Sequence, residues 1–173
     1  MRPGPAAPRT GFSLLELLIS ISILSILAAV ALPTLRTRLA SARDARRLQD
    51  IKSIQQAIDQ YFLDNRSYPA IGTSGPGGWD VSSDGDFIPL LVRGGYLPAV
   101  AQDPLNTGAY YYSYYLYPKG SYGCASDASF YVLGVKNFET ADCAAKNKGW
   151  FQCSGRNWNN EFAYVTGGGA SFQ

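Results

Sequence analysis

Cysteines and carboxylates are the residues of this chain that could do chemistry, because its 173 residues include no histidine. The missing imidazole excludes Ser-His-Asp and Cys-His nucleophile sets, HExxH zinc sites and His-ligated catalytic metals. The three cysteines, Cys124, Cys143 and Cys153, match no metal-binding spacing. We therefore expect no enzyme activity and interpret the chain as a binding or structural protein.

Outside the cytoplasm, one disulfide and one free thiol are the expected state of these cysteines. Pairing Cys124 with Cys143 would have to join the two ends of a predicted strand that spans roughly 30 Å. We favour a bridge between Cys143 and Cys153, with Cys124 and Cys153 as the alternative pair.

One carboxylate stands inside the most apolar part of the chain. Residues 12–32 read FSLLELLISISILSILAAVAL and contain a single ionisable side chain, Glu16. About 20 such residues cross the hydrocarbon core of a bilayer as a helix. A carboxylate in hydrocarbon costs about 2.5–3.5 kcal/mol on insertion scales, so we expect Glu16 to have a partner or a function. The alternative is that Glu16 lies close enough to the bilayer edge to reach the headgroups.

Four interpretations of this apolar segment compete. It is apolar all round, which argues against a buried helix of a globular core. A secretory signal peptide, with Ala29-Val30-Ala31 as its cleavage site, is the second interpretation, and an ordinary membrane anchor is the third. The fourth depends on the residues that flank the segment.

Residues 11–16, GFSLLE, followed by the apolar run and Pro33, resemble the class III signal of type IV pilins and type II secretion pseudopilins. The resemblance implies that residues 1–11 are a leader, that a prepilin peptidase cuts after Gly11, and that Phe12 becomes N-methylated. Glu16 and Pro33 then match the fifth and twenty-second positions of the mature family pattern. In the family, the matching glutamate pairs with the amino terminus of a neighbouring subunit and sets the assembly register.

The leader also accounts for the net charge. The chain has 15 Lys+Arg and 13 Asp+Glu, and residues 1–11 contain Arg2 and Arg9 but no acid. The predicted mature chain therefore has balanced side-chain charge, which avoids cumulative self-repulsion in a stack of many copies.

Helix is expected to resume after Pro33, which can kink or interrupt it, because residues 34–65 contain no Gly or Pro. Large apolar side chains of this segment share one stripe at about 100° per residue, namely Leu48, Ile51, Ile54, Ile58, Tyr61 and Phe62. Leu35, Leu39 and Ala42 project to the opposite side, where we expect a neighbouring subunit. We interpret the basic residues 36–47 as a solvated or headgroup-facing helix surface.

Residues 66–173 are expected to form a globular head. Tyr68-Pro69 closes the helix, residues 70–86 form an exposed, mobile Gly/Ser-rich loop, and residues 87–93 form a short helical turn. Strands are predicted at 109–117, at 129–139 and within 150–164, as an antiparallel meander on one side of the helix. The fold class is therefore α+β. A long N-terminal helix, hydrophobic in its first half, packs at its C-terminal half against a small antiparallel sheet, which is the pilin fold that the resemblance implies.

The predicted strand at 109–117, AYYYSYYLY, carries aromatic residues on both faces. One face should pack on the helical stripe. For the other face we expect cross-strand aromatic packing, and a carbohydrate or surface-adhesion face is the alternative.

The spacing of Tyr68-Pro69, Gly95-Tyr96-Leu97 and Asp103-Pro104 extends the resemblance to the major pseudopilin of type II secretion, which has a calcium site. The residues after Asp103-Pro104 and the cysteine-bearing tail depart from that protein. We therefore expect no metal and no cofactor. The oxygen ligands that a calcium ion would use are Asp127, Glu139 and Asp142.

The resemblance implies a structural subunit that is stored in the inner membrane as a single-pass precursor and is cut after Gly11. A pilus assembly platform and its ATPase would then build it into a homo-oligomeric filament. We favour an extracellular type IV pilus, for adhesion, motility or DNA uptake, over a periplasmic pseudopilus, because of the long tail and the extra cysteines.

A minor or competence pilin is the other alternative, and it would present the loop 140–160 to DNA or a surface. The residues that would bind there are Lys146, Lys148, Trp150, Arg156 and Trp158. We expect instead a solvated basic loop over a partly buried tryptophan, and no nucleic-acid partner.

Overall fold

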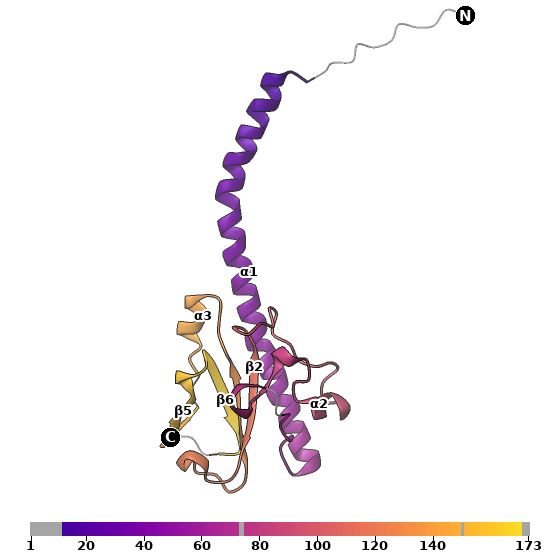
Figure 1. Cartoon of the computed structure of the whole chain (residues 1–173), viewed down its shortest axis with the longest axis vertical. Coiled ribbons are helices and arrows are strands. Elements are labelled where there is room, and N and C mark those ends of the chain that lie inside the picture. Colours follow the sequence, from indigo (N-terminus) through magenta and orange to yellow (C-terminus); the bar gives the residue numbers. More distant parts are fainter. Residues whose placement is uncertain (1–11, 73–74, 150, 171–173) are drawn as a thin grey trace, which may run out of the picture. The chain divides into compact units, whose positions relative to one another are not determined.

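The computed structural model describes residues 12–72, 75–149 and 151–170 of the chain (Figure 1). It divides into two compact units, Met1–Leu39 and Ala40–Gln173. The architecture is a long N-terminal helix followed by a small antiparallel sheet, so the predicted α+β fold class is confirmed.

Helix α1 runs from Leu14 to Asn65 with Pro33 inside it, so the proline does not interrupt the helix. The missing amide of Pro33 removes one hydrogen bond, but Ala31 and Leu32 before it and Leu35 and Arg36 after it are strong helix formers. Serine hydroxyls in the apolar part donate to carbonyl oxygens four residues earlier, as Ser20 does to Glu16 and Ser25 to Ile21, each at 2.7 Å. These bonds satisfy the hydroxyl donors within the helix itself.

The main sheet has four antiparallel strands in the order β1-β2-β3-β6. Their bounds are β1 (Asp80–Val81), β2 (Tyr112–Tyr117), β3 (Phe130–Val135) and β6 (Tyr164–Gly168). A separate hairpin joins β4 (Gln152–Cys153) to β5 (Arg156–Asn157). Two short helices complete the head, α2 (Pro89–Arg93) and α3 (Ala141–Lys146). The predicted strands at 109–117 and 129–139 and the predicted turn at 87–93 therefore correspond to β2, β3 and α2.

Two sequence predictions are wrong in this region. The segment 79–82 of the predicted exposed loop is buried, because β1 pairs with the edge of β2 and Trp79 and Val81 fill the core behind it. The last sheet strand begins only at Tyr164, the final residue of the predicted window 150–164, and the window instead holds the β4–β5 hairpin. Glycines obscure β6 in the sequence, yet Gly167 is needed there because a Cβ atom would collide with the ring of Phe151.

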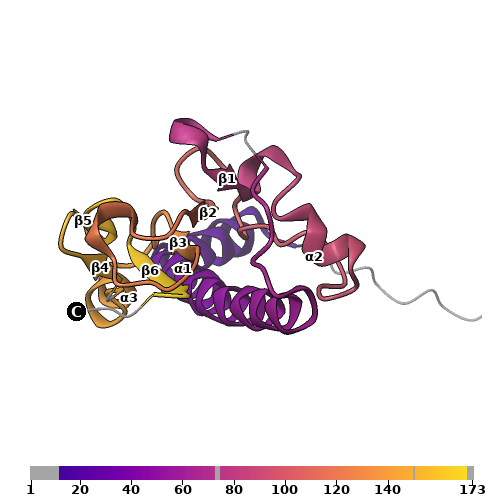
Figure 2. The same ribbon diagram turned by 90° about the horizontal axis from the view of Figure 1, so that it is seen from below.

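The sheet separates two hydrophobic cores. On one side, the stripe of α1 packs against the sheet, and α2 covers the same side (Figure 2). Tyr112 and Tyr114 of β2 point into this first core, as predicted, with their hydroxyls bonded to Asp50 (2.8 Å) and to the carbonyl oxygen of Pro69 (2.8 Å). On the other side, the C-terminal residues around Phe151 and Trp158 form a second core.

Candidate functional site

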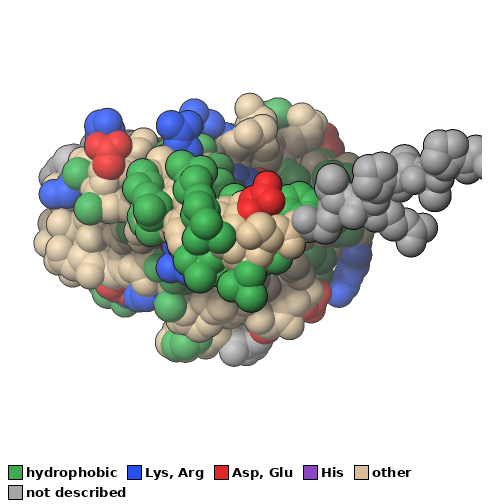
Figure 3. Space-filling view, turned by 90° about the horizontal axis from the view of Figure 1, so that it is seen from above, with side chains coloured by type: hydrophobic (Ala, Val, Ile, Leu, Met, Phe, Trp, Pro, Cys, Tyr) green, Lys and Arg blue, Asp and Glu red, His purple; other side chains and the backbone are tan. Residues whose placement is uncertain are grey.

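Every side chain from residue 12 to residue 39 is exposed. This part of α1 includes an 18-residue window with a mean hydropathy of 2.5, of which 0% is buried inside the protein. By length and composition it could cross a membrane, a test that a signal sequence also passes. Figure 3 shows hydrophobic side chains, in green, gathered at this end of the helix.

The predicted processing and assembly residues lie at the start of this segment. Gly11 and the leader 1–11 fall outside the described residues. Phe12 is 81% exposed and precedes the first residue of α1, Leu14. Glu16 lies in the first helical turn, where the helix dipole favours a carboxylate, and within the described chain no cation pairs with it.

A buried guanidinium fastens α1 to the head. Arg47 is completely buried, and its Nε and Nη2 atoms donate to both carboxylate oxygens of Asp103, at 2.6 and 2.9 Å. Its Nη1 atom donates to Asp44 at 2.7 Å and to Glu139 at 2.8 Å. Because Asp103 and Glu139 are far from Arg47 in sequence, these bonds tie the helix to two separate loops of the head.

The three carboxylates around Arg47 have further donors. Asp44 accepts the backbone N–H groups of Glu139 and Thr140, both at 2.9 Å, and the Thr140 hydroxyl at 2.7 Å. Asp103 accepts the N–H of Leu105 at 2.8 Å. We name the group formed by Arg43, Asp44, Arg47, Asp103 and Glu139 the Arg47 cluster. Asp44, Arg47 and Asp103 are buried, Arg43 and Glu139 are partly buried, and all five are hydrogen-bonded, which is the condition for burying charges without a large penalty.

Ionisation in the Arg47 cluster follows from these contacts. Hydrogen bonds from Arg43, joined by those from Arg47, lower the pKa of Glu139 to about 2. Burial acts to lower the pKa of Arg47, but its hydrogen bonds to Asp103 and Glu139 outweigh that effect and raise it. Glu139 and the two arginines are therefore charged at neutral pH.

The prediction that residues 36–47 form a solvated basic surface is correct for Arg36, Arg38 and Arg46 but wrong for Arg47. The physical reason is helical spacing. Asp44 and Arg47 precede Ile51 and Ile54 at intervals of three and four residues, so they extend the buried stripe of α1 toward its N-terminus. That spacing is the sequence signal for the buried pair, and a stripe defined by apolar residues alone does not include it.

The oxygen ligands considered for calcium do not converge. Glu139 is held by two arginines, and Asp142 pairs with Lys146 at 2.9 Å. Within the described part of the chain, no group of three potential ligands has a geometry that could hold a metal ion.

The structure pairs Cys124 with Cys153 and leaves Cys143 free, so the favoured Cys143–Cys153 bridge is wrong and the alternative pair is formed. Gly155 donates its N–H to the carbonyl oxygen of Tyr122 at 2.9 Å, which holds the loop before β3 against the β4–β5 hairpin. Cys143 lies on α3, whose first turn is capped by Thr140 and so tied to the Arg47 cluster.

The basic loop offers no exposed stacking surface at Trp158, which is completely buried in the second core. Arg156 pairs with Glu161 at 2.8 Å. Trp150 falls outside the described residues. Of the predicted nucleic-acid contacts, Lys146 and Lys148 remain at the surface, and Lys146 is paired with Asp142.

Comparisons with known proteins agree with the resemblance of residues 11–33 to pilins and pseudopilins. The family described as "Prokaryotic N-terminal methylation motif" matches residues 7–32. The chain is 34% identical over 100 residues to type II secretion system core protein G of Aeromonas hydrophila, covering 56% of this chain and 67% of that protein. The protein of the same name from Vibrio cholerae is 32% identical over 108 residues, covering 61% and 71%.

Core protein G of Pseudomonas aeruginosa is 40% identical over a shorter alignment of 62 residues, which covers 36% of this chain and 44% of that protein. No solved structure shows a significant match to the chain.

Proposed function

Because the chain belongs to the family of type IV pilins and type II secretion pseudopilins, we propose that it is a structural subunit of a type II secretion pseudopilus. The relatives named core protein G support this choice over the type IV pilus that the long, cysteine-bearing tail favoured. The residues of that tail form the second core, and its disulfide lies within the same head. The length of the tail and its cysteines therefore do not require a role specific to pili.

The observation that carries the proposal is that every side chain of the largely apolar segment 12–39 is exposed. Burying one Leu or Ile side chain is worth about 1.5–3 kcal/mol, so a segment of this composition requires lipid or another subunit around it. We propose that lipid of the inner membrane covers it in the precursor, and that neighbouring copies of the same helix cover it in the filament. Leu35 and Leu39, which are also exposed, would be covered by neighbours there.

Processing and location follow as parts of the same proposal. Prepilin peptidase would cut after Gly11 and Phe12 would be methylated, after which an assembly platform and its ATPase would build the filament. The Cys124–Cys153 disulfide supports a head on the oxidising, periplasmic side of the membrane. We expect no catalytic activity and no cofactor.

Processing is tested on the full chain co-expressed with a prepilin peptidase, by intact mass and N-terminal sequencing. The expected product begins with N-methylated Phe12. A product beginning at Leu32 would indicate an ordinary secreted domain, an intact Met1 would indicate an unprocessed anchor, and each contradicts the proposal.

Assembly is tested with Glu16→Ala, compared with Asp127→Ala, which removes an exposed carboxylate of the head. Glu16→Ala should leave the protein in the membrane but strongly reduce filaments, because the buried amino terminus of a neighbour loses its counter-charge. Asp127→Ala should assemble normally. Abundant normal filaments from the Glu16 variant would contradict the assembly role.

The pseudopilus and the pilus are distinguished in the native host. Deletion of the gene should stop release of secreted proteins into the medium and leave surface filaments and surface motility unchanged. Unchanged secretion together with lost surface filaments would instead establish a type IV pilus subunit.

A further inference from the structure

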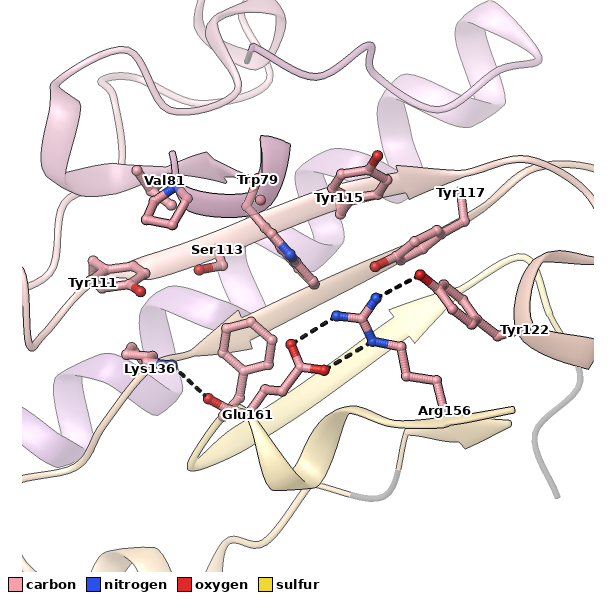
Figure 4. A pocket seen from close by; sticks show the side chains of 13 residues that line it. Trp79, Val81, Tyr111, Ser113, Tyr115, Tyr117, Tyr122, Lys136, Arg156 and Glu161 are labelled. Atoms are coloured by element: carbon pink, nitrogen blue, oxygen red, sulfur yellow. Dashed lines mark hydrogen bonds and ion pairs between the residues drawn. The ribbon is translucent and has the colours of Figure 1, made fainter. Parts of the chain in front are cut away.

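A pocket of about 460 Å³ opens on the side of the sheet that faces away from α1 (Figure 4). Alternate residues of one chain segment, Tyr111, Ser113, Tyr115 and Tyr117, line it, as the two-residue period of a strand requires. Its volume lies within the range of about 300–1,000 Å³ that is usual for small-molecule sites. The aromatic packing predicted for this face is therefore present but does not close it.

Aromatic rings from three parts of the head form the walls. The Trp79 ring, which precedes β1, lies with its centroid 5.4 Å from that of Tyr115 and 5.0 Å from that of Phe162. Tyr115 and Tyr117 lie 4.4 Å apart along β2. The pocket therefore offers flat apolar surfaces on which a ring-shaped ligand can rest.

A hydroxyl group lies unsatisfied among these rings. The Ser113 side chain is completely buried, and its Oγ atom has no hydrogen-bond partner within the described residues. The half-buried Tyr111 and Tyr115 also line the pocket. A buried hydroxyl without a partner costs about 1–3 kcal/mol, so the fold retains at Ser113 a group that a ligand could satisfy.

The charges of the pocket favour an anion. Arg156 is neutralised by two hydrogen bonds to Glu161, at 2.9 and 2.8 Å. Lys136 donates to the backbone oxygen of Glu161 at 3.0 Å but makes no ion pair within the described chain (Figure 4). Two cations and one carboxylate leave the lining with a net charge of +1.

The same two cations exclude a cationic ligand. The guanidinium of Arg156 lies 5.0 Å from the Tyr122 ring centroid, and the Lys136 ammonium lies 5.5 Å from that of Phe162. The ring faces of Tyr122 and Phe162 are thus already occupied by charges of the chain itself, and these charges repel a second cation.

We propose that this pocket binds an acidic saccharide, such as a hexuronic acid unit of a surface or capsular polysaccharide. The C–H face of the sugar ring rests on the half-buried ring of Tyr115, its hydroxyls exchange hydrogen bonds with Ser113, and its carboxylate faces Lys136. A sugar fits better than a peptide, because Ser113 and Tyr114 of β2 already pair with β1 on one side and with β3 on the other, so the backbone beside Ser113 offers no edge for a peptide strand.

The binding test uses the full chain in detergent micelles, with trigalacturonate as the acidic probe and galactotriose as the neutral probe, measured by calorimetry. Because of Lys136, trigalacturonate should bind about tenfold more tightly than galactotriose. This ratio of affinities is the usual effect of one charge-assisted hydrogen bond. Lys136→Gln should abolish that preference. Lys119→Gln, which changes an exposed lysine outside the pocket, should keep it.

Ser113→Ala separates a binding role from a packing role. Removing the unsatisfied hydroxyl should raise the melting temperature of the free protein and weaken trigalacturonate binding several-fold. A stabilised variant with unchanged affinity would overturn the proposal. It is equally overturned if the unaltered chain binds neither sugar at millimolar concentration, or if the two sugars bind equally well.

Discussion

The two halves of α1 carry the same kinds of apolar side chain in opposite surroundings. In residues 14–39, large side chains such as Leu14 and Leu24 are 83% and 63% exposed. In residues 40–65, Ile51, Ile54 and Ile58 are at most 1% exposed, because the sheet covers them. The first half is apolar all round, whereas the second half concentrates its apolar residues in one stripe.

The difference shows what each pattern requires. A stripe can be covered by a single surface, and the chain supplies that surface itself. An all-round apolar helix needs cover on every side, which one small sheet cannot provide. Substitutions in the second half should therefore reduce the stability of the head, and those in the first half should affect insertion and assembly.

Arg47→Ala should have the largest effect on the head. It leaves Asp44, Asp103 and Glu139 buried without the cation that they share, and removing one partner of such a group costs about 3–5 kcal/mol. Chemical denaturation of the full chain in detergent, followed by tyrosine and tryptophan fluorescence, measures the loss. The neighbouring Arg46→Ala should cost about 0–1 kcal/mol, because Arg46 is 66% exposed. Equal losses from the two variants would contradict the buried role of Arg47.

Ile58→Ala tests the stripe directly. Ile58 is completely buried in the first core, and truncating such a side chain costs about 3 kcal/mol through lost burial and the cavity left behind. Leu24→Ala, in the exposed half, should leave the unfolding midpoint of the head unchanged. A comparable loss from Leu24→Ala would mean that the head also covers the first half of α1.

Acid should weaken the head through Glu139, with a smaller effect. Its pKa is lowered from the ordinary 4.5 to about 2 by Arg43 and Arg47. The resulting stabilisation, about 2 kcal/mol once screening by solvent is allowed for, is fully present above pH 4.5 and is lost as the pH falls toward 2.

Glu139→Gln should lower stability at pH 7 and flatten the decline between pH 4.5 and pH 2. Asp142→Asn, at the exposed pair with Lys146, serves as the matched control and should leave the decline in place. An unchanged acid profile in the Glu139 variant would contradict the assignment.

The features that the sequence predicts correctly depend on residues that lie close together in the chain. The sequence predicted the helix stripe, the packing of one face of the strand 109–117 on that stripe, and the helical turn at 87–93, but not that the face would be the one with Tyr112 and Tyr114. The missed features depend on residues far apart in the chain. Arg47 meets Asp103 across 56 positions, and Asp44 meets Thr140 across 96.

Two other misses have a different cause. The strand β1 arises in a Gly/Ser-rich stretch because β2 offers it an unpaired edge, which no property of Asp80 or Val81 reveals. The choice of Cys124 over Cys143 as the partner of Cys153 depends on which loops lie side by side, and sequence spacing does not encode that.

The bridge between Cys124 and Cys153 also has a mechanical consequence. It closes a covalent ring across a sequence separation of 29, which contains β3 and α3. Under a pulling force, the enclosed segment cannot lengthen, so roughly 100 Å of contour stays hidden even when the head is forced open. A protease that cuts once inside the ring releases no fragment. After a single cut inside the ring, the disulfide therefore still connects β6 covalently to the rest of the head.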